Sequence, residues 1–199
     1  MLLGLNCSAD TCEIIPGHSA VKDVIVVDKN GALYSGRENQ NIYKQAISGI
    51  SNKQKLRGPL SYVIKGADAV IGVSGPNLIT QSMIRSMAKD AIVFAMANPI
   101  PEIMPGEALT AGAAIVASGR SDFPNQINNA LVFPGIFLAV IKGRLTKVTQ
   151  EMKDTASKTL ANLVKNPTPT NIIPDMFYPK LAQHLSQAIL KVKTNTKYG

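Results

Sequence analysis

Four short runs of apolar residues, separated by segments with helical periodicity, limit what this 199-residue chain can fold into. The runs are rich in valine, isoleucine and alanine and cover residues 24–27, 69–73, 91–97 and 113–117. Strands of a parallel sheet are typically short, almost uninterrupted apolar runs of this kind, because helices bury both faces of the sheet. Helices are expected between the runs, over residues 58–65, 78–89 and 105–111. The alternation predicts a doubly wound parallel α/β sheet, since connections between parallel strands cross over in the right-handed sense.

The pattern becomes helical throughout beyond Gly135, with helices expected over residues 136–141, 149–164 and 179–192. The prolines within residues 166–170 interrupt this part, because a proline cannot continue a helix. A chain of this length with 45% hydrophobic residues can bury one substantial core. We therefore expect one domain over residues 21–193, a divergent segment over residues 1–20 and a frayed tail over residues 194–199.

Composition excludes several classes of protein. No apolar stretch approaches the roughly 20 residues that span a bilayer, and the N-terminus lacks the order of a signal peptide, so we expect a cytoplasmic protein without membrane contact. Cys7 and Cys12 are too few for a disulfide framework or a zinc site. The net charge of +8 arises mostly after residue 141, where the sequence contains ten Lys and Arg but only three acidic residues. These cations lack interleaved aromatic residues, so we expect solvated helix faces and no nucleic-acid partner.

A segment dense in amides, SGRSDFPNQINN over residues 118–129, directly follows the fourth apolar run. Open α/β sheets bind their ligands at this end of their strands. Its amide side chains are Asn125, Gln126, Asn128 and Asn129. Buried amides need partners for donors and acceptors, and a pocket for a small polar acid supplies them. The alternative is that these amides cap a turn and the next helix, but for the four together we favour a ligand site.

This segment, the VFPG that follows at residues 132–135 and the upstream AMANPIPEI at residues 95–103 resemble the cofactor-binding half of bacterial-type malic enzymes. Those enzymes oxidise and decarboxylate malate to pyruvate while reducing NAD or NADP. The similarity extends from about Val21 to about Ile189. It implies a Rossmann-like domain in which Asn98 contacts the nicotinamide end and the substrate, while Asn128 and Asn129 position malate.

The resemblance places the glycine-rich phosphate turn at residues 4–9, which read GLNCSA. Gly4 and Ala9 fit the G-x-G-x-x-G/A pattern, but Asn6 stands at the second glycine, where its Cβ obstructs close approach of the backbone to a ligand. Pro16 would break the helix that follows the turn. The central strand would have only residues 1–3. We therefore expect a degenerate first strand and turn, with exposed edges on the neighbouring strands.

Three further residues are predicted to contact the dinucleotide. Asp28 ends the first apolar run, where a carboxylate can accept hydrogen bonds from the adenosine ribose. Its charge would repel a 2′-phosphate and favour NAD, although Lys29 and Arg37 could counter that repulsion. The alternative is a plain Asp-Lys-Asn-Gly turn. By resemblance Ser74 and Gly75 contact the dinucleotide, and the alternative is a plain strand-to-helix turn.

The catalytic groups of the family have no match in this sequence. The resemblance implies a Mg or Mn ion that binds malate, a lysine that acts as general base and a tyrosine that acts as acid. In the family these groups lie mostly upstream of the glycine-rich turn. We therefore assign no catalytic residue and no metal ligand, and we expect a truncated chain that is inactive alone. A non-catalytic dinucleotide-binding remnant or subunit is the alternative, and the expected partners are a separate N-terminal half or further copies of the chain.

Overall fold

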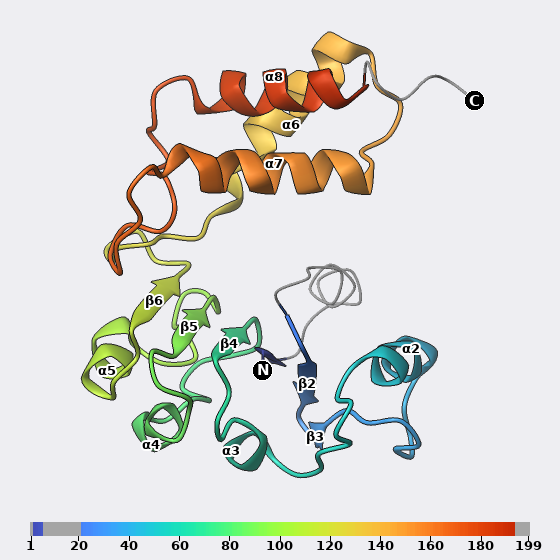
Figure 1. Cartoon of the computed structure of the whole chain (residues 1–199), viewed down its shortest axis with the longest axis vertical. Helices are drawn as coiled ribbons and strands as arrows, with labels where there is room; N and C mark the ends of the chain where they lie inside the picture. The colour runs from blue at the N-terminus through green and yellow to red at the C-terminus, as the bar shows by residue number, and fades with distance from the viewer. Residues whose placement is uncertain (1, 6–20, 194–199) are drawn as a thin grey trace. The chain divides into compact units, whose positions relative to one another are not determined.

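The computed structural model describes residues 2–5 and 21–193, and it divides the chain into two compact units (Figure 1). We call Met1–Phe123 the sheet unit and Pro124–Gly199 the helical unit. Within the described residues, no helix combines the length and the apolar character that crossing a membrane requires.

The sheet unit is built on a six-stranded sheet with the strand order β3-β2-β1-β4-β5-β6. The strands are β1 (Leu2–Leu5), β2 (Val24–Asp28), β3 (Gly31–Ala32), β4 (Ala69–Gly72), β5 (Ile92–Ala95) and β6 (Ile115–Ser118). All neighbouring strands are parallel except β3, which pairs antiparallel with β2 at one edge. This order confirms the predicted Rossmann-like α/β class.

Strand β1 lies in the middle of the sheet and corrects the expectation that it ends at residue 3. Gly4 pairs with Val26 of β2 and with Ile71 of β4, and Leu5 continues both registers. The inner edges of β2 and β4, which were expected to be exposed, are therefore paired. Gly4 belongs to the strand itself, and the remainder of the predicted phosphate turn, residues 6–9, lies outside the described residues.

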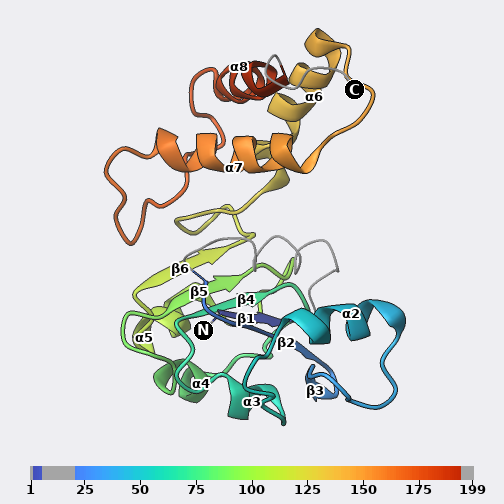
Figure 2. The same ribbon diagram turned by 45° about the vertical axis from the view of Figure 1, so that its right-hand side comes forward.

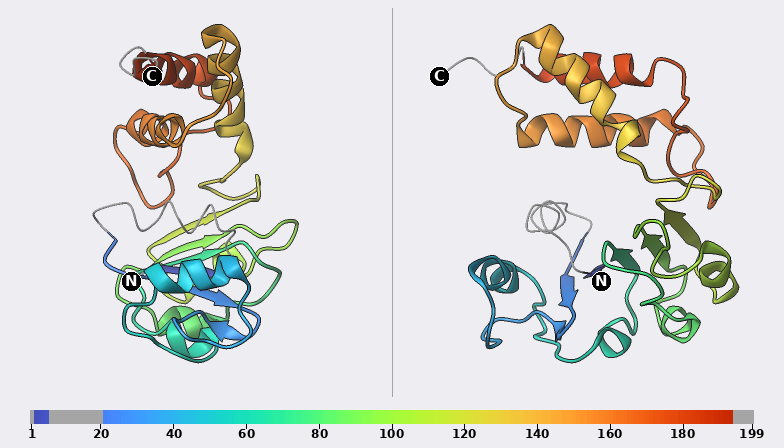
Figure 3. Two further views of the ribbon diagram at one scale, coloured as in Figure 1. Left: turned by 90° about the vertical axis from the view of Figure 1, so that its right-hand side faces the viewer. Right: turned by 180° about the vertical axis from the view of Figure 1, so that it is seen from behind.

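Helices lie on both faces of the sheet (Figures 2 and 3). They are α2 (Ile42–Ile50), α3 (Leu60–Val63), α4 (Gln81–Arg85) and α5 (Pro105–Thr110). In β2, Ile25 and Val27 belong to the buried cluster shared with α3, α4 and α5, whereas Val24 and Val26 pack with Ile47 of α2. Side chains alternate across a strand, so a strand covered by helices on both faces is apolar at every position.

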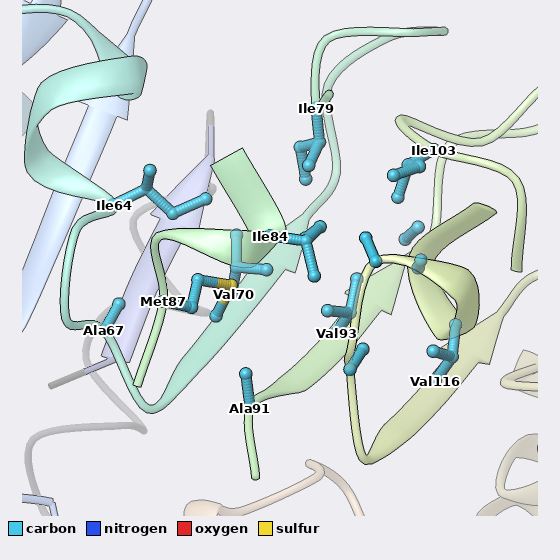
Figure 4. Close-up of a cluster of buried hydrophobic side chains, with 14 of the residues drawn as sticks. Ile64, Ala67, Val70, Ile79, Ile84, Met87, Ala91, Val93, Ile103 and Val116 are labelled. Atoms are coloured by element: carbon cyan, nitrogen blue, oxygen red, sulfur yellow. The ribbon is translucent and has the colours of Figure 1, made fainter. Parts of the chain in front are cut away.

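The larger of these two clusters contains Val70 of β4 and Val93 of β5, together with Ile64 at the end of α3, Ile84 of α4 and other buried side chains (Figure 4). Both valines are fully buried. Burying one such aliphatic side chain stabilises a fold by roughly 1.5–3 kcal/mol, so this cluster fixes how the strands and helices lie together.

Helix α4 is shorter than the helix predicted over residues 78–89. It begins after Thr80, whose Oγ1 accepts a hydrogen bond from the Met83 N–H, and Ser86 caps its other end. Ile79 is outside the helix because its N–H donates to the carbonyl oxygen of Glu102 at 2.9 Å. The helical periodicity therefore overestimated the length of this element.

The helical unit consists of η1 (Asn129–Leu131), α6 (Phe133–Gly143), α7 (Gln150–Leu163) and α8 (Leu181–Lys193), in agreement with the helices predicted beyond Gly135. Helix α8 packs against both α6 and α7 around a buried cluster that includes Leu185 and Ile189. A Cβ atom at Gly135 would collide with the side chain of Leu185, so glycine permits the close approach of α6 and α8.

Candidate functional site

An open pocket of about 930 Å³ lies in the sheet unit, where β2 and β4 end. Open α/β sheets bind ligands at this carboxyl edge, and the volume is within the range of small-molecule and cofactor sites. The pocket brings together three residues that the sequence predicted, Asp28, Ser74 and Gly75. Its other lining residues are Val27, Lys29, Asn30, Gly31, Lys44, Gly58, Pro59, Leu60 and Leu78.

Asp28 is the last residue of β2 and also the first residue of a tight turn. It pairs with Gly31 of β3, and its Oδ1 accepts a hydrogen bond of 2.9 Å from the Asn30 N–H. The turn considered as an alternative is therefore present. Asp28 also lines the pocket, so the residue predicted to contact the dinucleotide belongs to this turn.

Two cations bind the Asp28 carboxylate. Arg37 Nη2 donates to Oδ1 at 2.9 Å and to Oδ2 at 3.2 Å, and Lys44 Nζ donates to Oδ2 at 2.6 Å. Burial raises the pKa of Asp28, but the hydrogen bonds from Lys44, Arg37 and Asn30 outweigh burial and place it below its ordinary value. The carboxylate is thus ionised, and both of its oxygens are engaged.

The cluster of Asp28, Arg37 and Lys44 carries one net positive charge, and Lys29 lines the same pocket. The sequence predicted that Asp28 could repel a 2′-phosphate and that Lys29 and Arg37 could counter the repulsion. The sequence does not point to Lys44, because its partner Asp28 lies 16 residues away and in a different element. Its side chain is 38% exposed, so Lys44 is the member of the cluster most accessible to a ligand.

A second missed residue, Glu102, lies behind the connection that carries Ser74 and Gly75. Its side chain is completely buried. Glu102 Oε1 accepts hydrogen bonds from the Ser74 N–H at 2.8 Å and from the Ser74 Oγ at 3.4 Å, and its Oε2 accepts from the Ala97 N–H at 3.1 Å. One carboxylate therefore joins the connection after β4 to the connection after β5. An acidic residue between apolar neighbours in the segment IPEI was the available signal in the sequence.

Asn98 follows Ala97 in the connection after β5 and is exposed. It is not among the residues that line the pocket. Its neighbour Ala97 is held by Glu102, so the backbone on the amino side of Asn98 is fixed. An exposed amide on an anchored backbone can donate to and accept from a ligand.

The predicted amides of the helical unit have different roles. Asn125 is buried, its Nδ2 donates to the Pro169 carbonyl oxygen at 2.8 Å and its Oδ1 accepts from the Ile172 N–H at 2.9 Å. Asn128 caps η1 through its Oδ1, which accepts from the Ala130 N–H at 2.9 Å. Asn129 is exposed. The capping alternative thus holds for one atom of Asn128, and its Nδ2 and the side chain of Asn129 can still face a ligand.

The described residues do not fit a divalent metal ion. They contain no group of three or more His, Cys, Asp or Glu side chains that could hold one. Mg²⁺ and Mn²⁺ need several oxygen ligands, but the carboxylates of Asp28 and Glu102 are already engaged by cations and by N–H groups.

Comparison with known proteins gives one consistent match. Residues 11–195 match the family described as "Malic enzyme, NAD binding domain". The chain is 43% identical to the bifunctional malic/malolactic enzyme of Bacillus subtilis, covering 90% of this chain and 44% of that protein. It is 40% identical to the NAD-dependent malic enzyme of Geobacillus stearothermophilus, covering 98% of this chain and 41% of that protein. It is 37% identical to the NADP-dependent malic enzyme of Halomonas elongata, covering 86% of this chain and 40% of that protein.

Solved structures agree with this match. The crystal structure of malic enzyme from Pyrococcus horikoshii superposes with a TM-score of 0.89 at 35% identity, covering 100% of this chain and 50% of that one. The chain therefore spans less than half the length of these three curated relatives and about half of the solved structure.

Proposed function

The chain belongs to the malic enzyme family and corresponds to its NAD-binding domain, and from this premise we propose that the pocket beside Asp28 binds the adenosine end of NAD or NADP. The observation that carries the proposal is the meeting of Asp28, Ser74 and Gly75 around one pocket at the carboxyl edge of the sheet. Lys29 and Lys44 add positive charge to its wall, which favours a ligand that carries phosphates.

We propose that the pocket serves the oxidative decarboxylation of malate to pyruvate, carried out together with the remainder of the family fold. The dinucleotide, when bound, supplies the hydride acceptor for this oxidation. The residues of this chain bind and orient. Ser74 and Gly75 hold the dinucleotide against the backbone, and Asn98 offers its amide to the nicotinamide end. By resemblance to the family, the amides of Asn128 and Asn129 are assigned to malate. The general base, the acid and the metal ligands are not assigned to any residue here.

A second candidate function is a dinucleotide-binding subunit that does not turn over malate by itself. It is favoured by the engagement of the Asp28 carboxylate by Lys44 and of the Glu102 carboxylate by the Ser74 N–H. NAD or NADP reduction by the purified chain with malate and Mn²⁺, above a blank without malate, would exclude this candidate. A separate N-terminal half, assembly with further copies of the chain and a cytoplasmic location stay predictions.

The proposed pocket can be tested with a substitution that fills it without disturbing the fold. Its chain neighbours aside, a Cβ built at Gly75 meets no atom of the described residues within 4 Å, so Gly75→Val should fold normally and place its methyl groups at the pocket wall. Gly106→Val is the matched control, because a Cβ at Gly106 on α5 likewise meets no atom of a residue outside its own helix within 4 Å in the described part of the chain, and Gly106 does not line the pocket.

Calorimetric titration of the wild-type chain with NAD and NADP should give saturable binding. We expect Gly75→Val to weaken it by about tenfold or more, which corresponds to at least ~1.4 kcal/mol, and Gly106→Val to leave it unchanged. Absence of saturable binding by a folded wild-type chain, or equal affinities of both variants, would contradict the proposed pocket.

A further inference from the structure

We propose that Glu102 is a positioning residue that holds the connection after β4 and the connection after β5 in one arrangement suited to bind the dinucleotide. The proposal rests on the proposed function, because these connections carry Ser74, Gly75 and Asn98. Glu102 itself is completely buried and does not line the pocket. It would act through the backbone of the residues that do bind.

The contacts of the carboxylate identify what it positions. Oε1 accepts from the Ser74 N–H at 2.8 Å, and Oε2 accepts from the Ala97 N–H at 3.1 Å. Within residues 21–193, no lysine, arginine or histidine forms an ion pair with Glu102. The two oxygens of this buried side chain thus accept hydrogen bonds from the backbone of two different connections. A buried polar group of this kind fixes the positions of the groups that it binds, because breaking either hydrogen bond would leave a buried oxygen without a partner.

The backbone around Glu102 reinforces the same link. The Asn77 N–H donates to the Pro101 carbonyl oxygen at 3.1 Å, and the Ile79 N–H donates to the Glu102 carbonyl oxygen at 2.9 Å. Ile79 and Ile103 are both buried in the core cluster, where Figure 4 draws them. The segment that carries Glu102 is thus anchored in the core and bonded along the connection from β4 to α4.

Gly72, the last residue of β4, makes room for the carboxylate. A Cβ at position 72 would lie 2.5 Å from Glu102 Cδ and 2.7 Å from its Oε1. A larger residue at this position and the observed carboxylate cannot coexist. The strand therefore ends in glycine where the buried acid is seated.

The carboxylate of Glu102 accepts hydrogen bonds from both connections at once. Its two oxygens accept from N–H groups that belong to different connections, whereas a glutamine would present an NH₂ donor to one of them. Methionine would keep a similar side-chain volume and offer no comparable acceptor to either N–H group. Glu102→Gln should consequently loosen one connection, and Glu102→Met should loosen both.

Amide hydrogen exchange of the full chain, measured by NMR, tests this directly. Glu102→Gln should speed exchange of the Ser74 or the Ala97 amide by about tenfold or more, and Glu102→Met should speed both, because exchange requires the hydrogen bond to open. The affinity for NAD, measured by calorimetry, should fall in the same order. Gly72→Ala keeps the acid but displaces its carboxylate, so it should reproduce the faster exchange if a Glu102 variant does not fold.

Glu107→Gln is the matched control, because Glu107 is exposed on α5 and undergoes the same loss of charge. It should change neither exchange nor affinity. A uniform increase of exchange throughout the sheet unit in the Glu102 variants would overturn the proposal in favour of a merely structural role, and so would unchanged exchange at Ser74 and Ala97. If the wild-type chain binds no dinucleotide, the proposed function fails while the exchange measurements still decide whether Glu102 links the two connections.

Discussion

Replacing Lys44 with methionine should weaken NADP binding by about tenfold and change NAD binding by less than about twofold, because only NADP carries a 2′-phosphate. The substitution removes one of the two cations that bind Asp28 and takes the net charge of the cluster from +1 to zero. A phosphate charge about 4 Å from an ammonium gains ~1 kcal/mol in water and ~4 kcal/mol at an effective dielectric constant of about 20. Lys44 is 38% exposed, which favours the lower part of that range.

The assay is calorimetric titration of the wild-type chain and of Lys44→Met with each dinucleotide, at low and at moderate salt. Lys89→Met is the matched control, because Lys89 is exposed, belongs to the sheet unit and does not line the pocket. The difference between the variants should shrink as salt rises, since ions screen exposed charges. An equal loss for NAD and NADP, or the same loss in Lys89→Met, would refute a local role of Lys44 at the 2′-position.

Three further predictions concern stability. Burial raises the pKa of Asp28, but hydrogen bonds from Lys44 and Arg37 outweigh burial and hold this pKa below its ordinary value of 3.8. The ionised carboxylate therefore contributes fully to the free energy of unfolding at pH values above 3.8. This contribution is lost as the pH falls through the pKa that Asp28 has in the folded chain. The urea concentration at the midpoint of unfolding, measured between about pH 5 and 2.5, should therefore depend less on pH in Asp28→Asn than in the wild type. The same pH dependence in both proteins would count against this prediction. Asn125→Ala should lower the free energy of unfolding by about 1–3 kcal/mol because it removes two partly buried hydrogen bonds, whereas Asn129→Ala should change it by less than about 0.5 kcal/mol. Equal losses in these two variants would mean that Asn129 also has a structural role. Gly135→Ala should cost about 1–3 kcal/mol through collision with Leu185, and a wild-type melting temperature would show that α6 and α8 can separate without cost.

The strands that could be predicted are those whose side chains are buried on both faces, since an uninterrupted apolar run such as residues 24–27 records that burial directly. Helix α2 escaped prediction because Ile42, Tyr43 and Ile50 are exposed while Ile47 is buried, which blurs the expected one-sided pattern. Strand β3 has two residues, too few for any periodicity. The length of β1 depends on pairing with two neighbours, and its own residues carry little sign of that pairing.

The same distinction applies to the site. Asp28 could be predicted because it ends a strand at the edge of the sheet where ligands bind, and Ser74 and Gly75 could be predicted from their resemblance to the family. Lys44 and Glu102 were missed because their partners are distant in sequence and become neighbours only when the sheet forms. The structural role of Asn125 was hidden for the same reason, since its partners Pro169 and Ile172 lie more than 40 residues further along the chain.

The central claim is that the dinucleotide lies at the carboxyl edge of β2 and β4. Titration of the isotopically labelled 199-residue chain with NAD, followed by amide chemical shifts in NMR spectra, tests it most directly. We expect saturable shifts at Asn30, Gly31, Ser74 and Gly75, which line the pocket. Saturable shifts elsewhere that leave these four amides unchanged would contradict the claim.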